Sequence, residues 1–142
     1  MKKKYVLVLL MMLAIGTIAL AQQGYNFPGY QCQQLLYRDS SRQLINLTNK
    51  VESVLLFFPS GNDGLILNIS FTDGSLPLMY FFMDAQRLSD GSTFFNNVSQ
   101  EDPETMRTIA EGFAGGYKRE GSKAVIIINR GTVTYLNLTL IE

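Results

Sequence analysis

Four aspartates are the first side chains in this sequence that could carry out chemistry. Each lies in or beside a turn of a predicted strand meander, and they are Asp63, Asp73, Asp84 and Asp90. Carboxylates gathered at one end of a sheet can bind a hard cation such as calcium. However, no segment matches the spacing of a calcium loop, and a glycine follows three of these aspartates, as tight turns require. We therefore expect turn formation here, with no metal ion and no cofactor.

The chain contains no histidine. This removes the commonest general base, the commonest metal ligand and the imidazole of serine and cysteine triads. Glu101, Asp102 and Glu104 stand together, but their position predicts the start of a helix rather than two acids facing each other across a cleft. An enzyme built from this sequence would need a histidine-free site of carboxylate, tyrosine and lysine groups, and it is the alternative hypothesis.

Cys32 is the only cysteine in the sequence, so a monomer cannot form an internal disulfide. Two main interpretations are open. The thiol is either buried as a small apolar group or paired with the same residue of a second chain, which would give a homodimer. A reactive thiol is the third interpretation.

Four sequons for N-glycosylation occur, at Asn46, Asn68, Asn97 and Asn137. In a eukaryotic secretory pathway some of them could carry glycans. The lysine-rich start followed by Leu, Met and Val is more typical of a bacterial protein, in which these sites would reflect only polar amides on strands. Both interpretations stay open.

The first 21 residues have the pattern of a cleavable signal peptide. Lys2, Lys3 and Lys4 precede a short apolar run, which ends in the small-x-small site Ala19-Leu20-Ala21. The run is shorter than the roughly 20 residues that a membrane-spanning helix needs, so we expect cleavage after Ala21 and no stable membrane span afterwards. The protein is therefore expected to be exported, either periplasmic or secreted, with residues 22–142 forming a single domain.

The charge balance argues against nucleic acid as a partner. Three of the 12 basic residues lie in the predicted signal, so the remaining chain carries more acidic groups than basic ones. No continuous basic stripe is present, because Glu120 interrupts the cluster of Lys118, Arg119 and Lys123.

Two segments have the signals of amphipathic helices. Ser40 and Gln43 match a capping box, which predicts a helix from about Ser41 to Lys50. Asp102-Pro103 predicts the start of a second helix from Pro103 to Ala114, which Gly115-Gly116 would end. Its apolar stripe follows the spacing i, i+3, i+4, i+7 and comprises Met106, Ile109, Ala110 and Phe113. A short helical stretch is also expected over Gln31 to Tyr37.

The other periodic segments predict strands. They cover Val54–Phe58, Leu65–Thr72, Leu76–Met83, Thr93–Val98 as a short edge strand, Ala124–Asn129 and Thr132–Ile141. The predicted fold is α+β: a mostly antiparallel sheet of five to six strands, made of a meander and a C-terminal hairpin. An N-terminal helix and one helix between meander and hairpin would complete it. No motif identifies a family.

The aromatic side chains are the most specific functional feature. The apolar run from Met79 to Met83 needs cover on both faces of its sheet, and two helices would leave part of it open. We therefore expect an exported, non-enzymatic binding or assembly module whose partner is an unknown exported protein or an apolar ligand. The expected surface comprises Phe27, Tyr30, Tyr80 and Phe82. In the competing interpretation, the aromatic segment before Tyr37 is a lid on its own sheet.

Overall fold

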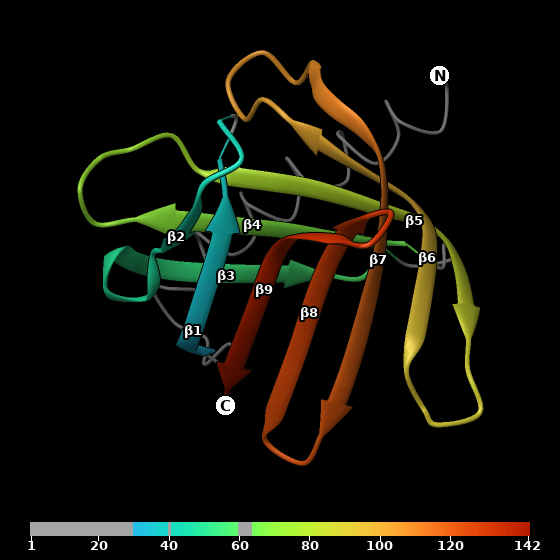
Figure 1. Cartoon of the computed structure of the whole chain (residues 1–142). Helices are drawn as coiled ribbons and strands as arrows, with labels where there is room; N and C mark the ends of the chain where they lie inside the picture. The colour runs from blue at the N-terminus through green and yellow to red at the C-terminus, as the bar shows by residue number, and fades with distance from the viewer. Residues whose placement is uncertain (1–29, 40, 60–63) are drawn as a thin grey trace.

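The part of the chain that the structure describes forms a single antiparallel sheet, which curls into a half-barrel (Figure 1). The computed structural model describes residues 30–39, 41–59 and 64–142. Nine strands run in the order β1 (Gln31–Arg38), β2 (Leu44–Asn46), β3 (Val51–Phe57), β4 (Leu65–Phe71), β5 (Leu78–Arg87), β6 (Thr93–Glu101), β7 (Thr108–Glu120), β8 (Lys123–Arg130) and β9 (Val133–Ile141). One turn of 3-10 helix, η1 (Thr48–Lys50), lies between β2 and β3.

The strands from β3 to β9 form a continuous meander, and the N-terminal strand then pairs with the C-terminal one. The spatial order is β2-β1-β9-β8-β7-β6-β5-β4-β3. Where the sheet curls round, β1 approaches the segment before β3. There the Leu47 N–H donates to the Leu35 carbonyl at 2.9 Å, and the Leu35 N–H donates to Thr48 Oγ1 at 3.0 Å. These two bonds lie at the seam of the half-barrel.

Alternation along the strands divides the apolar residues between two faces. Leu65, Leu67 and Ile69 of β4 point into the main core on the concave side, together with Tyr80 and Phe82 of β5. The residues between them form a smaller buried cluster on the outer face, made of Ile66, Met79 and Phe81. The run from Met79 to Phe82 is therefore buried on both faces and does not leave the open apolar surface that the sequence predicted.

The predicted α+β class is wrong, because the described residues form no α-helix and nine strands instead of five or six. The helix expected from Ser41 to Lys50 is replaced by a turn, β2 and η1, and the helical stretch expected over Gln31 to Tyr37 is β1. At the start of the segment from Ser41 to Lys50, Asp39 stabilises a turn. Its Oδ1 accepts a hydrogen bond from the Gln43 N–H at 2.9 Å, and Arg42 has a φ of 65°. Such a φ interrupts a right-handed helix at once.

The helix expected from Pro103 to Ala114 is also absent, although its start signal acts locally. Asp102 Oδ1 accepts from the Glu104 N–H at 2.8 Å, and the Met106 N–H donates to the Asp102 carbonyl at 2.8 Å. This single turn ends at Met106, whose φ is 59°. The chain then continues as β7, so the capping chemistry makes the turn between β6 and β7.

A β-bulge explains why β7 has a helical apolar pattern. Ala110 lies opposite Gln100 and Phe113 lies opposite Val98, so three steps on β7 match two steps on β6. The extra residue returns Ala110 and Phe113 to the same concave face. Ile109, another member of the expected stripe, is 59% exposed.

The strand predictions agree better with the structure. β3, β4, β5, β8 and β9 overlap the predicted segments, and the segment expected to be a short edge strand is β6, which pairs on both sides.

Candidate functional site

The structure describes three of the four residues that the sequence suggested as a binding surface, and all three belong to or contact the main core. Tyr80 and Phe82 are 2% and 0% exposed and belong to the main core, so neither offers a surface. Burial also raises the pKa of Tyr80 far above its ordinary value, which keeps its hydroxyl protonated. Tyr30 is half-buried against the same core, and Phe27 lies outside the described residues.

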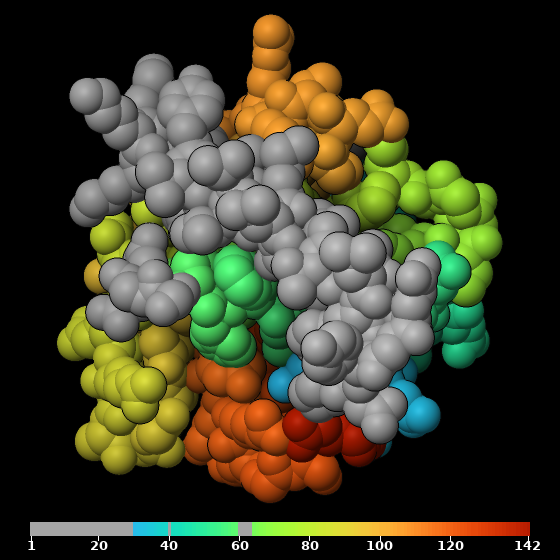
Figure 2. Space-filling model, turned by 180° about the vertical axis from the view of Figure 1, so that it is seen from behind, coloured from blue at the N-terminus to red at the C-terminus, as the bar shows by residue number. Residues whose placement is uncertain are grey.

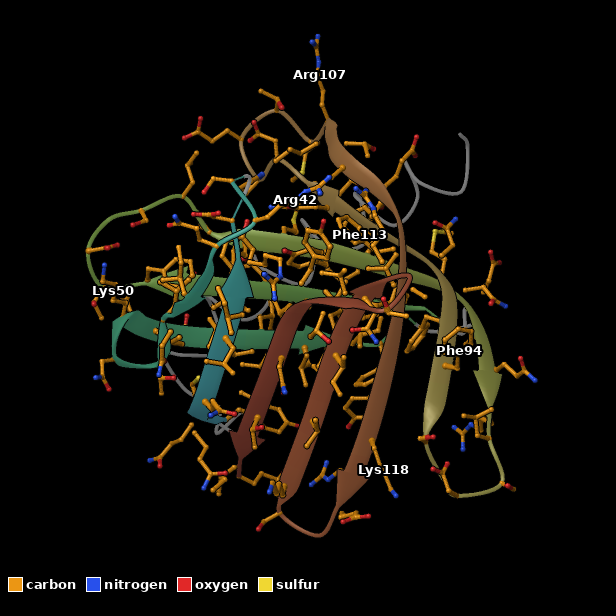
Figure 3. The ribbon with its side chains drawn as sticks, in the orientation of Figure 1. Arg42, Lys50, Phe94, Arg107, Phe113 and Lys118 are labelled. Atoms are coloured by element: carbon orange, nitrogen blue, oxygen red, sulfur yellow. The ribbon has the colours of Figure 1, made fainter. Side chains whose placement is uncertain are left out.

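A groove on the outer face of β6, β7 and β8 is a better candidate. It has a volume of about 380 Å³ and lies between the β5–β6 hairpin and the β7–β8 hairpin. Figures 1 and 2 show these two hairpins side by side from opposite directions. Figure 3 labels Phe94 on β6 and Lys118 on the lower part of β7, two of the three strands that form the groove.

A missing side chain creates this groove. Phe94 of β6, Gly116 of β7 and Ile127 of β8 lie opposite one another in register, so they form one row across the sheet. Phe94 and Ile127 line the groove on either side of the glycine. A Cβ at Gly116 would meet nothing nearer than the Thr93 carbonyl, at 3.9 Å. The row therefore has two large apolar walls with a gap between them.

Apolar side chains extend the groove, and charged ones stand at its rim. Leu88 and Val125 continue the apolar lining, while Lys118, Glu120 and Lys123 line the edge. Lys118 Nζ lies 3.0 Å from Glu120 Oε1 and 4.0 Å from Asp90 Oδ2 on the opposite hairpin. The second contact joins the two hairpins across the groove.

Two ionisable groups of the groove, Lys118 and Tyr117, have raised pKa values. The hydrogen bond and the charge of Glu120, with a smaller effect of Asp90, raise the pKa of Lys118, so the ammonium form is favoured. Burial is the main cause that raises the pKa of Tyr117, so its hydroxyl stays protonated. Both shifts oppose the role of a general base near neutral pH.

The turn aspartates bind their own backbone. Asp73 Oδ1 accepts from the Ser75 N–H at 2.9 Å, and Asp90 Oδ1 accepts from the Ser92 N–H at 3.0 Å. Hydrogen bonds from the serine hydroxyls are the largest cause that lowers the pKa of both carboxyls. Asp84 is exposed on β5, and Asp63 lies outside the described residues. In the part of the chain that the structure describes, no three His, Cys, Asp or Glu residues converge as metal ligands.

Cys32 and the asparagines of the four sequons differ in how far they are buried. Cys32 is half-buried on β1, and burial raises the pKa of its thiol, which lowers its reactivity. Asn46 and Asn97 are exposed and Asn137 is half-buried, but Asn68 Oδ1 is buried without a hydrogen-bond partner in the described structure.

Sequence reasoning missed the groove because its central residue was assigned to a helix end. The pair Gly115-Gly116 predicts the end of a helix, whereas both glycines lie within β7. The available signal was the mixture of Gly, Phe and Tyr in this segment, which is a poor helix composition.

Among the residues described, no helix has both the length and the apolar character needed to cross a membrane. Comparisons with protein-family models, curated proteins and solved structures found no match to this chain.

Proposed function

We propose that this protein is an exported, non-enzymatic module that binds a small apolar molecule in the groove over Gly116. The observation that carries the proposal is the row of Phe94, Gly116 and Ile127, in which two apolar walls flank an unfilled position. Small-molecule sites in proteins are concave, largely apolar and roughly 300–1,000 Å³ in volume, a range that includes this groove.

The rim favours an uncharged ligand. Lys118 is paired with Glu120 and Asp90, so most of the charge at the edge is balanced within the protein. A ligand with a strong charge of either sign would compete with these pairs. A neutral molecule with a flat or branched apolar body leaves them in place and covers Phe94, Val125 and Ile127.

Binding is favoured over the alternative of a histidine-free enzyme. The groove does contain tyrosine, lysine and carboxylate groups, in Tyr117, Lys118 and Glu120. However, the raised pKa values of Tyr117 and Lys118 favour their protonated forms, and catalysis by a general base requires the opposite shift.

Export and assembly are parts of the same proposal. Residues 1–21 lie outside the described structure, and their sequence supports cleavage after Ala21. Intact-mass measurement of the exported protein should give a chain that begins at Gln22.

Cys32 remains the candidate for a disulfide-linked homodimer, which non-reducing electrophoresis would reveal.

Filling the groove tests the proposed site. The probe is N-phenyl-1-naphthylamine, a neutral apolar dye whose fluorescence rises when it leaves water. Gly116→Val places a branched side chain in the gap, and strands accommodate valine well. We expect dye affinity to fall by about tenfold or more, the equivalent of roughly 1.4 kcal/mol.

The control is Ser53→Val, which adds a similar apolar side chain at an exposed position on β3, away from the groove. This variant should bind the dye like the wild type. Undiminished binding by folded Gly116→Val would show that the groove is not the site.

A further inference from the structure

We propose a second binding site inside the half-barrel, opposite the groove, which takes a small apolar carboxylate. A hollow of about 440 Å³ opens on the concave side at the ends of β3, β5, β6 and β7. Its walls include Phe58, Ala85, Phe95 and Tyr117, and Arg87 stands among them. The mouths of barrel-like sheets are common places for small-molecule sites.

The sheet register explains this hollow. Arg87 of β5, Thr93 of β6 and Tyr117 of β7 form one row on the concave face. Ala85 lies opposite Phe95 in the next row, and its small side chain leaves the space beside that ring open. The hollow therefore follows from a short side chain at Ala85, as the outer groove follows from Gly116.

Two aromatic rings form the outer part of the wall. Phe58, just after β3, packs edge-on against Tyr117, with ring centroids 5.5 Å apart and an interplanar angle of 64°. Phe95 lies deeper and packs against Phe82 of the main core at 5.3 Å. A ligand body in this hollow would contact aromatic surface on both sides.

Among the described residues that line the hollow, Arg87 is the charged one. Arg87 forms no ion pair with any residue within the described ranges, in contrast to Lys118 on the outer face. A guanidinium binds a carboxylate through two parallel N–H bonds, and it stays charged at any physiological pH. Thr93, next to Arg87 in the row, adds a hydroxyl. One cation beside aromatic walls fits a monoanion with an apolar body.

The outer groove and the inner hollow are separate sites on opposite faces of one sheet. They share only Thr93 and Tyr117 among their described lining residues. The outer groove is apolar with a balanced rim, whereas the described lining of the inner hollow contributes one cation, Arg87, that has no ion-pair partner among the described residues. Each can therefore be blocked without filling the other.

The test compares 1-naphthoic acid with its methyl ester, which has the same rings and no charge, by calorimetric titration of the mature protein carrying Gly116→Val, in which the outer groove is filled and the neutral ester cannot bind there. We expect the acid to bind about tenfold or more tightly than the ester, in line with the strength of charged hydrogen bonds. Arg87→Gln should reduce acid affinity to that of the ester and leave ester affinity unchanged. Arg87→Lys should restore part of the preference.

Two further variants locate the bound acid. Ala85→Leu should weaken acid and ester together by filling the hollow, whereas Gly116→Val should leave acid binding intact. Equal affinity for acid and ester in the Gly116→Val background would overturn the proposal, as would acid binding that survives Arg87→Gln or is lost in Gly116→Val itself. Because Arg87 is exposed, its variants stay informative even if Ala85→Leu does not fold.

Discussion

Two adjacent glycines have opposite functions at the residue scale. Gly115 points to the concave side, where an added Cβ would lie 2.7 Å from a ring carbon of Phe82 and 2.9 Å from Val98. Gly116 points outward into open space. The first glycine is required for close packing of the core, and the second leaves room for a ligand.

Substitution of each glycine by alanine distinguishes these two functions by its effect on stability. Gly115→Ala should lower the free energy of unfolding by about 1–3 kcal/mol, the usual cost of overpacking a core. Gly116→Ala should raise it by about 0.5 kcal/mol, because alanine loses less conformational entropy in a strand. Urea denaturation of both variants measures the difference. Equal destabilisation would contradict the assignment of the two glycines to opposite faces.

Irregular strands explain, at the element scale, why the segment from Pro103 to Ala114 has the sequence pattern of a helix. A bulge in β7 brings Ala110 and Phe113 to one face at a spacing of three, and an extra residue in β6 does the same for Phe95 and Val98. A spacing of three is typical of a helix and not of a regular strand. Strands with strict alternation, such as β4, were predicted correctly because nothing shifted their phase.

Ile109 and Phe113 distinguish the strand from the predicted helix. In a helix both would be core residues, whereas here Ile109 is 59% exposed and Phe113 is 5% exposed. Phe113 (labelled in Figure 3) packs against Tyr135 at 5.2 Å, and the Arg130 guanidinium lies 4.3 Å from its ring centroid. Phe113→Ala should cost about 3–5 kcal/mol and Ile109→Ala under about 0.5 kcal/mol in chemical denaturation. Comparable large losses would favour the helix.

Closure of the sheet is a property of the whole molecule that no local pattern encodes. The meander from β3 to β5 and the hairpin of β8 and β9 could be predicted, because their turns and alternation are local. The pairing of β1 with β9 joins residues about a hundred positions apart, and β1 has no clear alternation. The groove and the hollow also depend on register between strands, which is why Phe94, Gly116 and Arg87 were not recognised as site residues.

The seam beside β1 should therefore depend on a small number of polar contacts. Thr48 Oγ1 accepts from the Leu35 N–H at 3.0 Å, and the Leu35 side chain is fully buried. Thr48→Val keeps the shape of the side chain but removes the acceptor, so an amide at the seam is left unpaired, at a cost of about 1–2 kcal/mol.

Thr48→Ser is the matched control, because it keeps the hydroxyl. Hydrogen exchange followed by NMR should show faster exchange at Leu35 in Thr48→Val than in Thr48→Ser, while the amides of β8, which is paired on both sides, change little. If Leu35 exchanges equally slowly in both variants, the Thr48 hydroxyl does not hold the seam, and the pairing of β1 with β9 is sufficient to close the half-barrel.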